Sequence, residues 1–220
     1  MRTTAQIETA DRESIIKPVV HVRQQPASAA HSVWRTSVRF AVLTTIVLGL
    51  AYPLCITGIA QLLFPHQANG SLILKGGEVI GSELIGQTFT SDRYFHPRPS
   101  AAGNGYDATA SGGSNLAQSN AKLAQRMQAD IDRLQQADGL KPVPIDMVTM
   151  SASGLDPDIT PDNAYYQASQ IARSRKLSEE AVRDLIKAHI KNRDLKLFGE
   201  PRVNVLELNL ALDEASSSAK

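Results

Sequence analysis

The feature that most constrains this chain is a long apolar run without charge. Residues 40–65 read FAVLTTIVLGLAYPLCITGIAQLLFP and contain no charged side chain. About 20 apolar residues suffice to cross a hydrocarbon core roughly 30 Å thick. A buried helix of a soluble protein seldom keeps so long a stretch free of charge, and a cleaved signal peptide has a shorter apolar core. We therefore predict one transmembrane helix at residues 40–64.

The basic residues around this run predict its orientation. Six basic and three acidic residues precede it, whereas Lys75 is the only basic residue among the next twenty. Because cytoplasmic flanks carry the excess of Lys and Arg, we expect the N-terminus in the cytoplasm and the C-terminal part on the opposite side, which for a bacterial inner membrane is the periplasm. Residues 1–39 have scattered charges and no sustained apolar period. They are expected to form a disordered cytoplasmic tail.

Small residues recur along one side of the predicted span. Ala41, Thr45 and Gly49 lie four residues apart and share a helical face, where small side chains let a neighbouring helix approach closely. Pro53 follows four residues after Gly49, and its ring removes one backbone hydrogen bond, so we expect a kink there. These four residues are the predicted helix-packing site, although small residues and Pro are also common in membrane helices generally.

The composition excludes several classes of function. A chain of 220 residues with a net charge of +1 has room for one main domain and lacks the basic footprint of a nucleic-acid-binding protein. The only cysteine, Cys55, lies inside the apolar run, so no internal disulfide is expected. Phosphate-loop, GxSxG and HExxH motifs and spaced cysteines are missing, so neither a catalytic residue nor a metal site is expected.

After the span, strand and helix patterns alternate without a regular repeat. They predict a hairpin at 71–86, a helix from the N-cap Ser119 to near Gly139, a strand at 143–149, a helix from Thr160 to about Arg175, a second helix beginning at Ser178, and a strand at 202–213 in which leucines alternate with polar residues. We therefore predict an α+β domain at 66–213 and a flexible C-terminus at 214–220.

A polar cluster within residues 94–115 holds the candidates for chemistry. His96, Asp107 and either Ser111 or Ser114 are a conceivable base, orienter and nucleophile, because such a triad is set by geometry and not by chain order. This pattern gives the alternative of a membrane-tethered periplasmic hydrolase. A tethered sensor domain is a third hypothesis.

The structural interpretation of the same cluster is the stronger one. Gly112 and Gly113 allow backbone angles closed to other residues, while Ser111, Ser114 and Asn115 are residue types that bond to turn backbone. Arg98 stands between two prolines that stiffen its backbone. Its guanidinium is expected to pair with a carboxylate, within the fold in preference to one on a partner.

Six peptides occur in a specific order: QANGSLI at 67–73, GSELIGQ at 81–87, YFHPRPS at 94–100, SGGSNL at 111–116, VTMSASGLDPDIT at 148–160 and EPRVNVLELNLALD at 200–213. With the apolar run they closely resemble the C subunit of the bacterial Kdp potassium-transporting P-type ATPase. The resemblance covers roughly residues 38–213. Asp158 and Thr160 depart from it, since many relatives carry His and Ser there.

The resemblance implies an accessory subunit of an ATP-driven K⁺ uptake complex. Its partners are then a channel-like K⁺-translocating subunit and a P-type ATP-hydrolysing subunit, which this chain assembles or regulates. The DKTGT and TVGYG-like peptides of those subunits are missing here, so ATP, Mg²⁺ and K⁺ are expected to be used by the complex without being bound by this chain.

The resemblance also implies site residues and a role toward ATP. It marks motif loops that serve structure or interaction: His96, Arg98, Ser111, Gly112, Gly113, Ser114, Asn115 and Asp156. The family is described as raising the ATP affinity of the P-type subunit, which makes Ser111 and Gln167 candidate nucleotide contacts. A periplasmic domain does not meet cytoplasmic ATP, so we expect any such effect to pass through the membrane helix as a conformational coupling.

Overall fold

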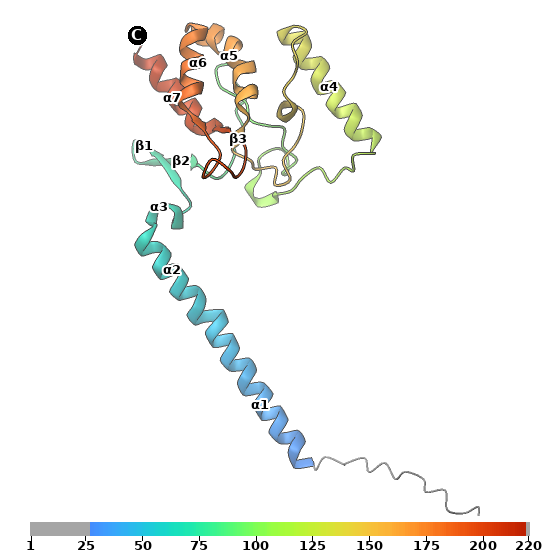
Figure 1. Ribbon diagram of the computed structural model, residues 1–220, viewed down its shortest axis with the longest axis vertical. Helices are drawn as coiled ribbons and strands as arrows, with labels where there is room; N and C mark the ends of the chain where they lie inside the picture. Colours follow the sequence, from blue (N-terminus) through green and yellow to red (C-terminus); the bar gives the residue numbers. More distant parts are fainter. Residues whose placement is uncertain (1–26, 219–220) are drawn as a thin grey trace, which may run out of the picture. The chain divides into compact units, whose positions relative to one another are not determined.

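A computed structural model describes residues 27–218 (Figure 1). The chain divides into two compact units, one that ends at Ile59 and one from Ala60 to the C-terminus. The first contains helix α1 (Ala27–Ile46), the π-helix η1 (Val47–Ala51) and most of helix α2 (Tyr52–Leu63). The second contains the remaining helices and all the strands of the described chain.

The apolar run forms a continuous helix, which begins earlier than expected. Residues Ser32–Leu63 are long and apolar enough, by length and composition, to cross a membrane, and they are the only such helix in the part of the chain that the structure describes. Helix α1 already begins at Ala27, so residues 27–39 are helical where disorder was expected. Ala27, Ala29 and Ala30 explain this, since alanine is the strongest helix former. The rest of the predicted tail lies outside the described residues.

The helix changes its hydrogen-bond pattern just before Pro53. Residues Val47–Ala51 form a π-helix, and the N–H of Tyr52 donates to the carbonyl of Val47, five residues back. Proline has no N–H to donate, and its ring crowds the carbonyl four residues earlier, which is that of Gly49. A π-turn relieves this conflict within the helix and is a known cause of kinks.

The predicted hairpin at the start of the second unit is confirmed. After the short helix α3 (Pro65–Ala68), strand β1 (Leu72–Lys75) pairs antiparallel with strand β2 (Glu78–Ser82). Gly76 and Gly77 form the turn with positive φ angles of 63° and 87°, a conformation that glycine adopts without strain.

The core lies between three helices and a small sheet. Helices α5 (Pro161–Arg175), α6 (Glu179–Ala188) and α7 (Val205–Ser218) pack together (Figure 1), and the sheet has the antiparallel order β3 (Asp158–Ile159), β5 (Arg202–Asn204), β4 (Ile190–Lys191). The predicted helix starts at Thr160 and Ser178 are confirmed, and each of these residues is an N-cap that accepts a hydrogen bond from the N–H of the third residue of its helix. The fully buried members include Phe95, Ile159, Ile171, Ile186, Leu208 and Leu212. This arrangement confirms an α+β fold.

The predicted strand at 202–213 is wrong beyond Asn204. Strand β5 ends there, and α7 begins at Val205 with the Asn204 carboxamide accepting from the N–H of Glu207 at 3.1 Å, as a helix N-cap does. Leu208, Asn209 and Leu212 are buried, and their spacing is that of one face of a helix. The alternation of leucines with polar residues suggested a strand instead. The helix runs on to Ser218, so residues 214–218 are helical where flexibility was expected.

Two further elements differ from the sequence predictions. The strand expected at 143–149 is instead a 3-10 helix, η3 (Ile145–Met147), because Asp146 turns inward to accept hydrogen bonds. Helix α4 (Ala121–Asp138) is capped by Asn120, one residue after the expected Ser119, and ends at Gly139 as predicted. It lies at the far end of the unit from α7 (Figure 1), and none of its described residues is fully buried.

Candidate functional site

Two buried amides hold the segment that carries the predicted site residues His96 and Arg98. The side chain of Asn209 bonds both the N–H of Phe95 at 2.8 Å and its carbonyl at 3.0 Å. Gln167 does the same for the N–H and carbonyl of His96, at 2.8 and 3.0 Å. The segment is thus fixed by side chains and needs no neighbouring strand.

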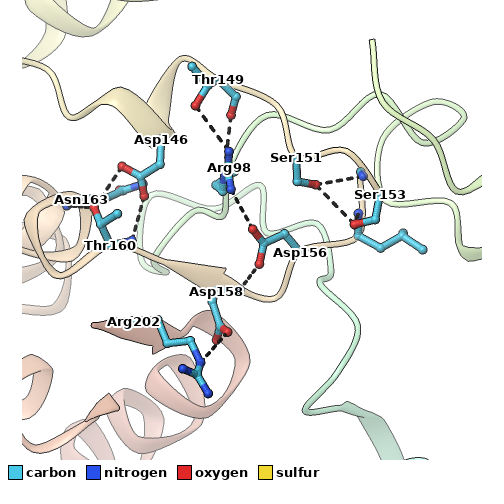
Figure 2. Close-up of polar contacts among 12 residues, drawn as sticks. Arg98, Asp146, Thr149, Ser151, Ser153, Asp156, Asp158, Thr160, Asn163 and Arg202 are labelled. Atoms are coloured by element: carbon cyan, nitrogen blue, oxygen red, sulfur yellow. Dashed lines mark hydrogen bonds and ion pairs between the residues drawn. The ribbon is translucent and has the colours of Figure 1, made fainter. Parts of the chain in front are cut away.

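Arg98 lies at the centre of a polar network that joins residues 94–115, the first loop region, to residues 140–160, the second loop region (Figure 2). Its guanidinium pairs with Asp156 at 2.8 Å, and it also donates to the carbonyl and the hydroxyl of Thr149, each at 3.4 Å. The other carboxylate oxygen of Asp156 accepts from the N–H of Asp158 at 3.1 Å. This pair fulfils the expectation that Arg98 meets a carboxylate within the fold.

Asp146 connects the second loop region to helix α5 (Figure 2). Its side chain is only 4% exposed and accepts from the N–H and hydroxyl of Thr160 and from the amide of Asn163, at 2.8, 3.0 and 3.0 Å. Thr160 in turn caps α5 by accepting from the N–H of Asn163. A buried carboxylate with three donors is satisfied and contributes to rigidity.

Ser100 and Tyr106 close a tight turn around Gly154. The Ser100 hydroxyl donates to the Gly154 carbonyl at 2.6 Å, and the Tyr106 hydroxyl donates to the carbonyl of Arg98 at 2.6 Å. Gly154 has φ +66°, and a Cβ there would meet the Gly112 carbonyl at 2.7 Å and the backbone N of Ala102 at 2.8 Å. Only glycine fits such a backbone approach.

The predicted loop at 111–115 packs on the second loop region. The Ser111 hydroxyl and the N–H of Gly112 both donate to the Ser153 carbonyl, at 3.0 and 2.8 Å. A Cβ on Gly113 would lie 3.1 Å from the Ala152 carbonyl oxygen, so this glycine permits close contact. Ser114 is half-buried beside it, and Asn115 is exposed with a left-handed φ of 53°.

The electrostatics of the network are set by burial and by close carboxylates. Burial raises the pKa of Asp158, the Asp156 carboxylate adds to that rise, and the Arg202 guanidinium, 3.3 Å away, opposes it. Burial likewise raises the pKa of the Tyr106 hydroxyl well above its usual range. At both side chains, partial burial removes water and so disfavours the charged form, the carboxylate of Asp158 and the phenolate of Tyr106.

A cleft of about 470 Å³ opens beside the clamped segment. His96, Arg98 and Gln167 line it together with residues of α4 and the loop through Tyr106. The Gln167 carboxamide is only 5% exposed, and it also donates to the Asn163 carboxamide at 2.7 Å. Of the two candidate nucleotide contacts, Gln167 therefore lies at this cleft, and its amide bonds His96 and Asn163. The other, Ser111, bonds the backbone of Ser153.

The members of the alternative triad have separate tasks in the structure. Asp107 caps the 3-10 helix η2 (Ala108–Ala110), where hydrogen bonds from the Thr109 hydroxyl and N–H lower the pKa of its carboxyl group. His96 lines the cleft and Ser111 bonds the second loop. Within residues 27–218, no group of three or more His, Cys, Asp or Glu side chains could hold a metal ion.

Several residues of the network carried no recognisable sequence signal. Asp146 lay in a presumed strand, and Asn209 lay on the presumed outer face of another, so neither was expected to be buried. Ser100 bonds the backbone of Gly154, 54 residues away, and Tyr106 bonds that of Arg98, 8 residues away, and neither contact is revealed by spacing alone. The position of Asn209 among leucines was the one sequence feature that could have indicated a buried polar side chain.

Comparisons with known proteins give one consistent result. The sequence model of KdpC, described as K⁺-transporting ATPase, c chain, matches residues 34–214. The potassium-transporting ATPase KdpC subunits of Koribacter versatilis and Acidobacterium capsulatum are 55% and 57% identical, over 81% and 82% of this chain and 92% and 97% of their own lengths. That of Myxococcus xanthus is 52% identical over 83% of this chain and 88% of its own.

Proposed function

Because this chain belongs to the KdpC family, the c chains of K⁺-transporting ATPases, we propose that it acts as a non-catalytic accessory subunit which assembles and stabilises that complex. The complex couples K⁺ transport to ATP through its other subunits. The partners proposed for this chain are a channel-like K⁺-translocating subunit and a P-type ATP-hydrolysing subunit.

The observation that carries this proposal is how the polar side chains of the candidate site are used. Arg98, Asp146, Ser100 and Gln167 each bond residues of the same chain, and most of those partners are backbone groups or carboxylates of the two loop regions. A reacting group needs a position within reach of substrate and a base or acid beside it. A network committed to its own loops is instead suited to presenting a rigid surface.

The membrane helix supports the same role. One apolar helix, Ser32–Leu63, anchors the chain, and the basic residues before it favour a cytoplasmic N-terminus and a periplasmic domain at 66–213. Ala41, Thr45, Gly49 and Pro53 are the proposed packing residues of this anchor. ATP, Mg²⁺ and K⁺ are bound by the partner subunits in this scheme.

An effect on ATP affinity is then indirect. If the domain faces the periplasm, Ser111 and Gln167 do not meet cytoplasmic nucleotide, and a change in ATP affinity passes through the helix as a shift between conformations of the partners. Coupling free energies of this kind are typically about 1–3 kcal/mol. The motif loops around His96, Arg98 and Asp156 contribute by holding the domain in shape.

Copurification tests the proposal. Tagged full-length chain, expressed with its neighbouring subunits and extracted in mild detergent, should retain two larger membrane proteins, one of them an ATPase. His96→Ala should retain both and leave K⁺-stimulated ATP hydrolysis largely unchanged, because no step is assigned to the imidazole. Purification of the chain alone, or a His96→Ala complex that assembles fully without turnover, would contradict the accessory role.

A further inference from the structure

The cleft beside His96 is bounded on one side by an incompletely packed face of helix α4. Asp130, Leu134, Ala137 and Asp138 all line the cleft, and their spacing places them on one side of the helix. Helix α4 is described in full, and none of its residues is fully buried. The space left open beside this face is the cleft, about 470 Å³ in volume. A pocket of this size suits a small organic molecule.

The walls of the cleft offer apolar contact to such a molecule. Leu134 and Ala137 line it from α4, and Phe89 and Met147 line it from other parts of the domain. The side chains of Phe89, Leu134 and Met147 are each only partly buried, so part of each is open to a ligand. Ligand sites are mostly lined by hydrophobic and aromatic side chains, with a few polar groups that fix the orientation of the ligand.

The charged residues of the lining are unequally paired. Arg98 is paired with a carboxylate outside the lining at 2.8 Å, and Arg133 is paired with Asp130 at 2.9 Å. The other two carboxylates of the lining, those of Asp92 and Asp138, have no ion-pair partner among residues 27–218. The cleft therefore carries an excess of negative charge, which attracts cations and repels anions such as the phosphates of a nucleotide.

Asp138 lies where a helix least favours a carboxylate. It is the last residue of α4, beside the final backbone carbonyls, which lack partners within the helix and carry partial negative charge. The last turn of α4 contains no basic residue that could offset this charge. A bound cation at this end of the cleft would stabilise both the carboxylate and the helix end.

We propose that this cleft binds a small organic cation, one that carries an ammonium or guanidinium group on an apolar body. The charge of the ligand lies within the field of Asp92 and Asp138, and its body packs on Phe89 and Leu134. Binding fills the open side of α4 and so orders that helix. This inference goes beyond the proposed accessory function and does not depend on it.

Three probes of nearly equal shape separate the effect of charge from that of apolar contact: tyramine, the neutral 4-hydroxyphenethyl alcohol and the anionic 4-hydroxyphenylacetate. In calorimetry of the full chain in detergent, tyramine should bind saturably at concentrations below roughly 10 mM. The alcohol should bind roughly tenfold more weakly and the acid not at all, because only the ammonium gains an oppositely charged partner. Equal binding of the amine and the alcohol, or no saturable binding of the amine, would overturn the proposal.

Asp138→Asn tests the assigned contact, with Asp132→Asn as the matched control. Each variant removes one carboxylate from α4, but Asp132 is exposed and does not line the cleft. Asp138→Asn should weaken tyramine binding by roughly tenfold, and the variant should fold, since it removes an unfavourable charge from a helix end. Asp132→Asn should bind like the wild type. Equal weakening in both variants would show a general attraction to acidic surface and would reject the site.

Hydrogen exchange of backbone amides shows whether the bound probe orders α4. Saturating tyramine should slow exchange in Ala121–Asp138 and leave it unchanged in α6, none of whose residues lines the cleft. Unchanged exchange in α4 at saturation would place the probe elsewhere and contradict the assignment. These measurements do not involve the partner subunits, so a negative result would leave the accessory function intact.

Discussion

At the scale of single residues, the domain depends on side chains that replace backbone pairing. Asn209 and Gln167 each bond both the N–H and the carbonyl of one residue in the segment 95–96, as a neighbouring strand would. Arg98 and Asp146 extend this support to the second loop region. Long connections with little secondary structure can be rigid when their backbone groups are satisfied in this way.

Asp158 gives the network a predictable response to pH. Burial and the nearby Asp156 raise the folded-state pKa of Asp158 above its ordinary value of 3.8. A carboxyl group with a raised folded pKa holds its proton more tightly in the folded state, so its contribution to stability is greatest at low pH and falls as the pH rises through the shifted pKa.

Asp158→Asn should remove that decline. Measured by chemical unfolding of the full chain in detergent, the free energy of unfolding of the variant minus that of the wild type should increase as the pH is raised from about 3.8 upward. The Arg202 partner limits the size of the effect. Parallel curves for the two proteins would show that Asp158 titrates as in the unfolded chain.

At the scale of elements, the sequence patterns succeeded where local chemistry decides the structure. Thr160 with Pro161, Ser178 and Gly139 mark helix ends through capping, and two glycines mark the hairpin turn, so these boundaries were correctly predicted. The sequence patterns gave the wrong element where tertiary contacts decide the secondary structure.

The C-terminal segment shows why. Leucines at 206, 208, 210 and 212 alternate as a strand would, yet Asn209 is buried because it reaches Phe95, 114 residues away. Asp146 is drawn inward by Thr160 in the same manner. The fold class and the Arg98 carboxylate pair were thus accessible from the sequence, but the Asn209, Gln167 and Asp146 contacts depend on long-range partners that periodicity does not encode.

The helix face of Ala41, Thr45 and Gly49 gives a prediction for the membrane element. A Cβ on Gly49 would lie 3.8 Å from the Thr45 methyl group, so the two positions adjoin and Gly49→Leu would fill the surface beside Thr45. If a neighbouring helix packs there, Gly49→Leu should release the chain from the purified complex. Leu48→Ile, a change of shape at a position 64% exposed, is the control and should be retained. Retention of both variants would rule out this packing face.

At the scale of the whole molecule, the orientation in the membrane is directly testable. In a Cys55→Ala background, Ser218→Cys should react with a membrane-impermeant thiol reagent on intact spheroplasts, while Ser28→Cys should react only after lysis. The excess of basic residues before the span is the reason for this expectation. The reverse labelling pattern would place the domain in the cytoplasm and reopen direct contact with ATP.

A measurement of nucleotide binding independently checks the prediction that this chain does not bind ATP directly. The purified full chain should show no saturable heat of ATP binding at millimolar nucleotide. Gly112 and Gly113 are not followed by the lysine of a phosphate loop, and the Gln167 amide is already engaged. Stoichiometric binding that disappears in Ser111→Ala or Gln167→Ala would establish a direct nucleotide site and overturn the indirect coupling.

The π-turn before Pro53 limits how a second helix can lie against the span. Because the Tyr52 N–H reaches back five residues to Val47, the turn accommodates one residue more than an α-helical turn does. Residues after the turn are therefore rotated around the axis relative to an uninterrupted α-helix, so the four-residue spacing from Ala41 to Gly49 does not by itself place Pro53 on the same line. A neighbouring helix that packs on Ala41, Thr45 and Gly49 would therefore follow the small residues up to the turn and meet a different set of side chains beyond it.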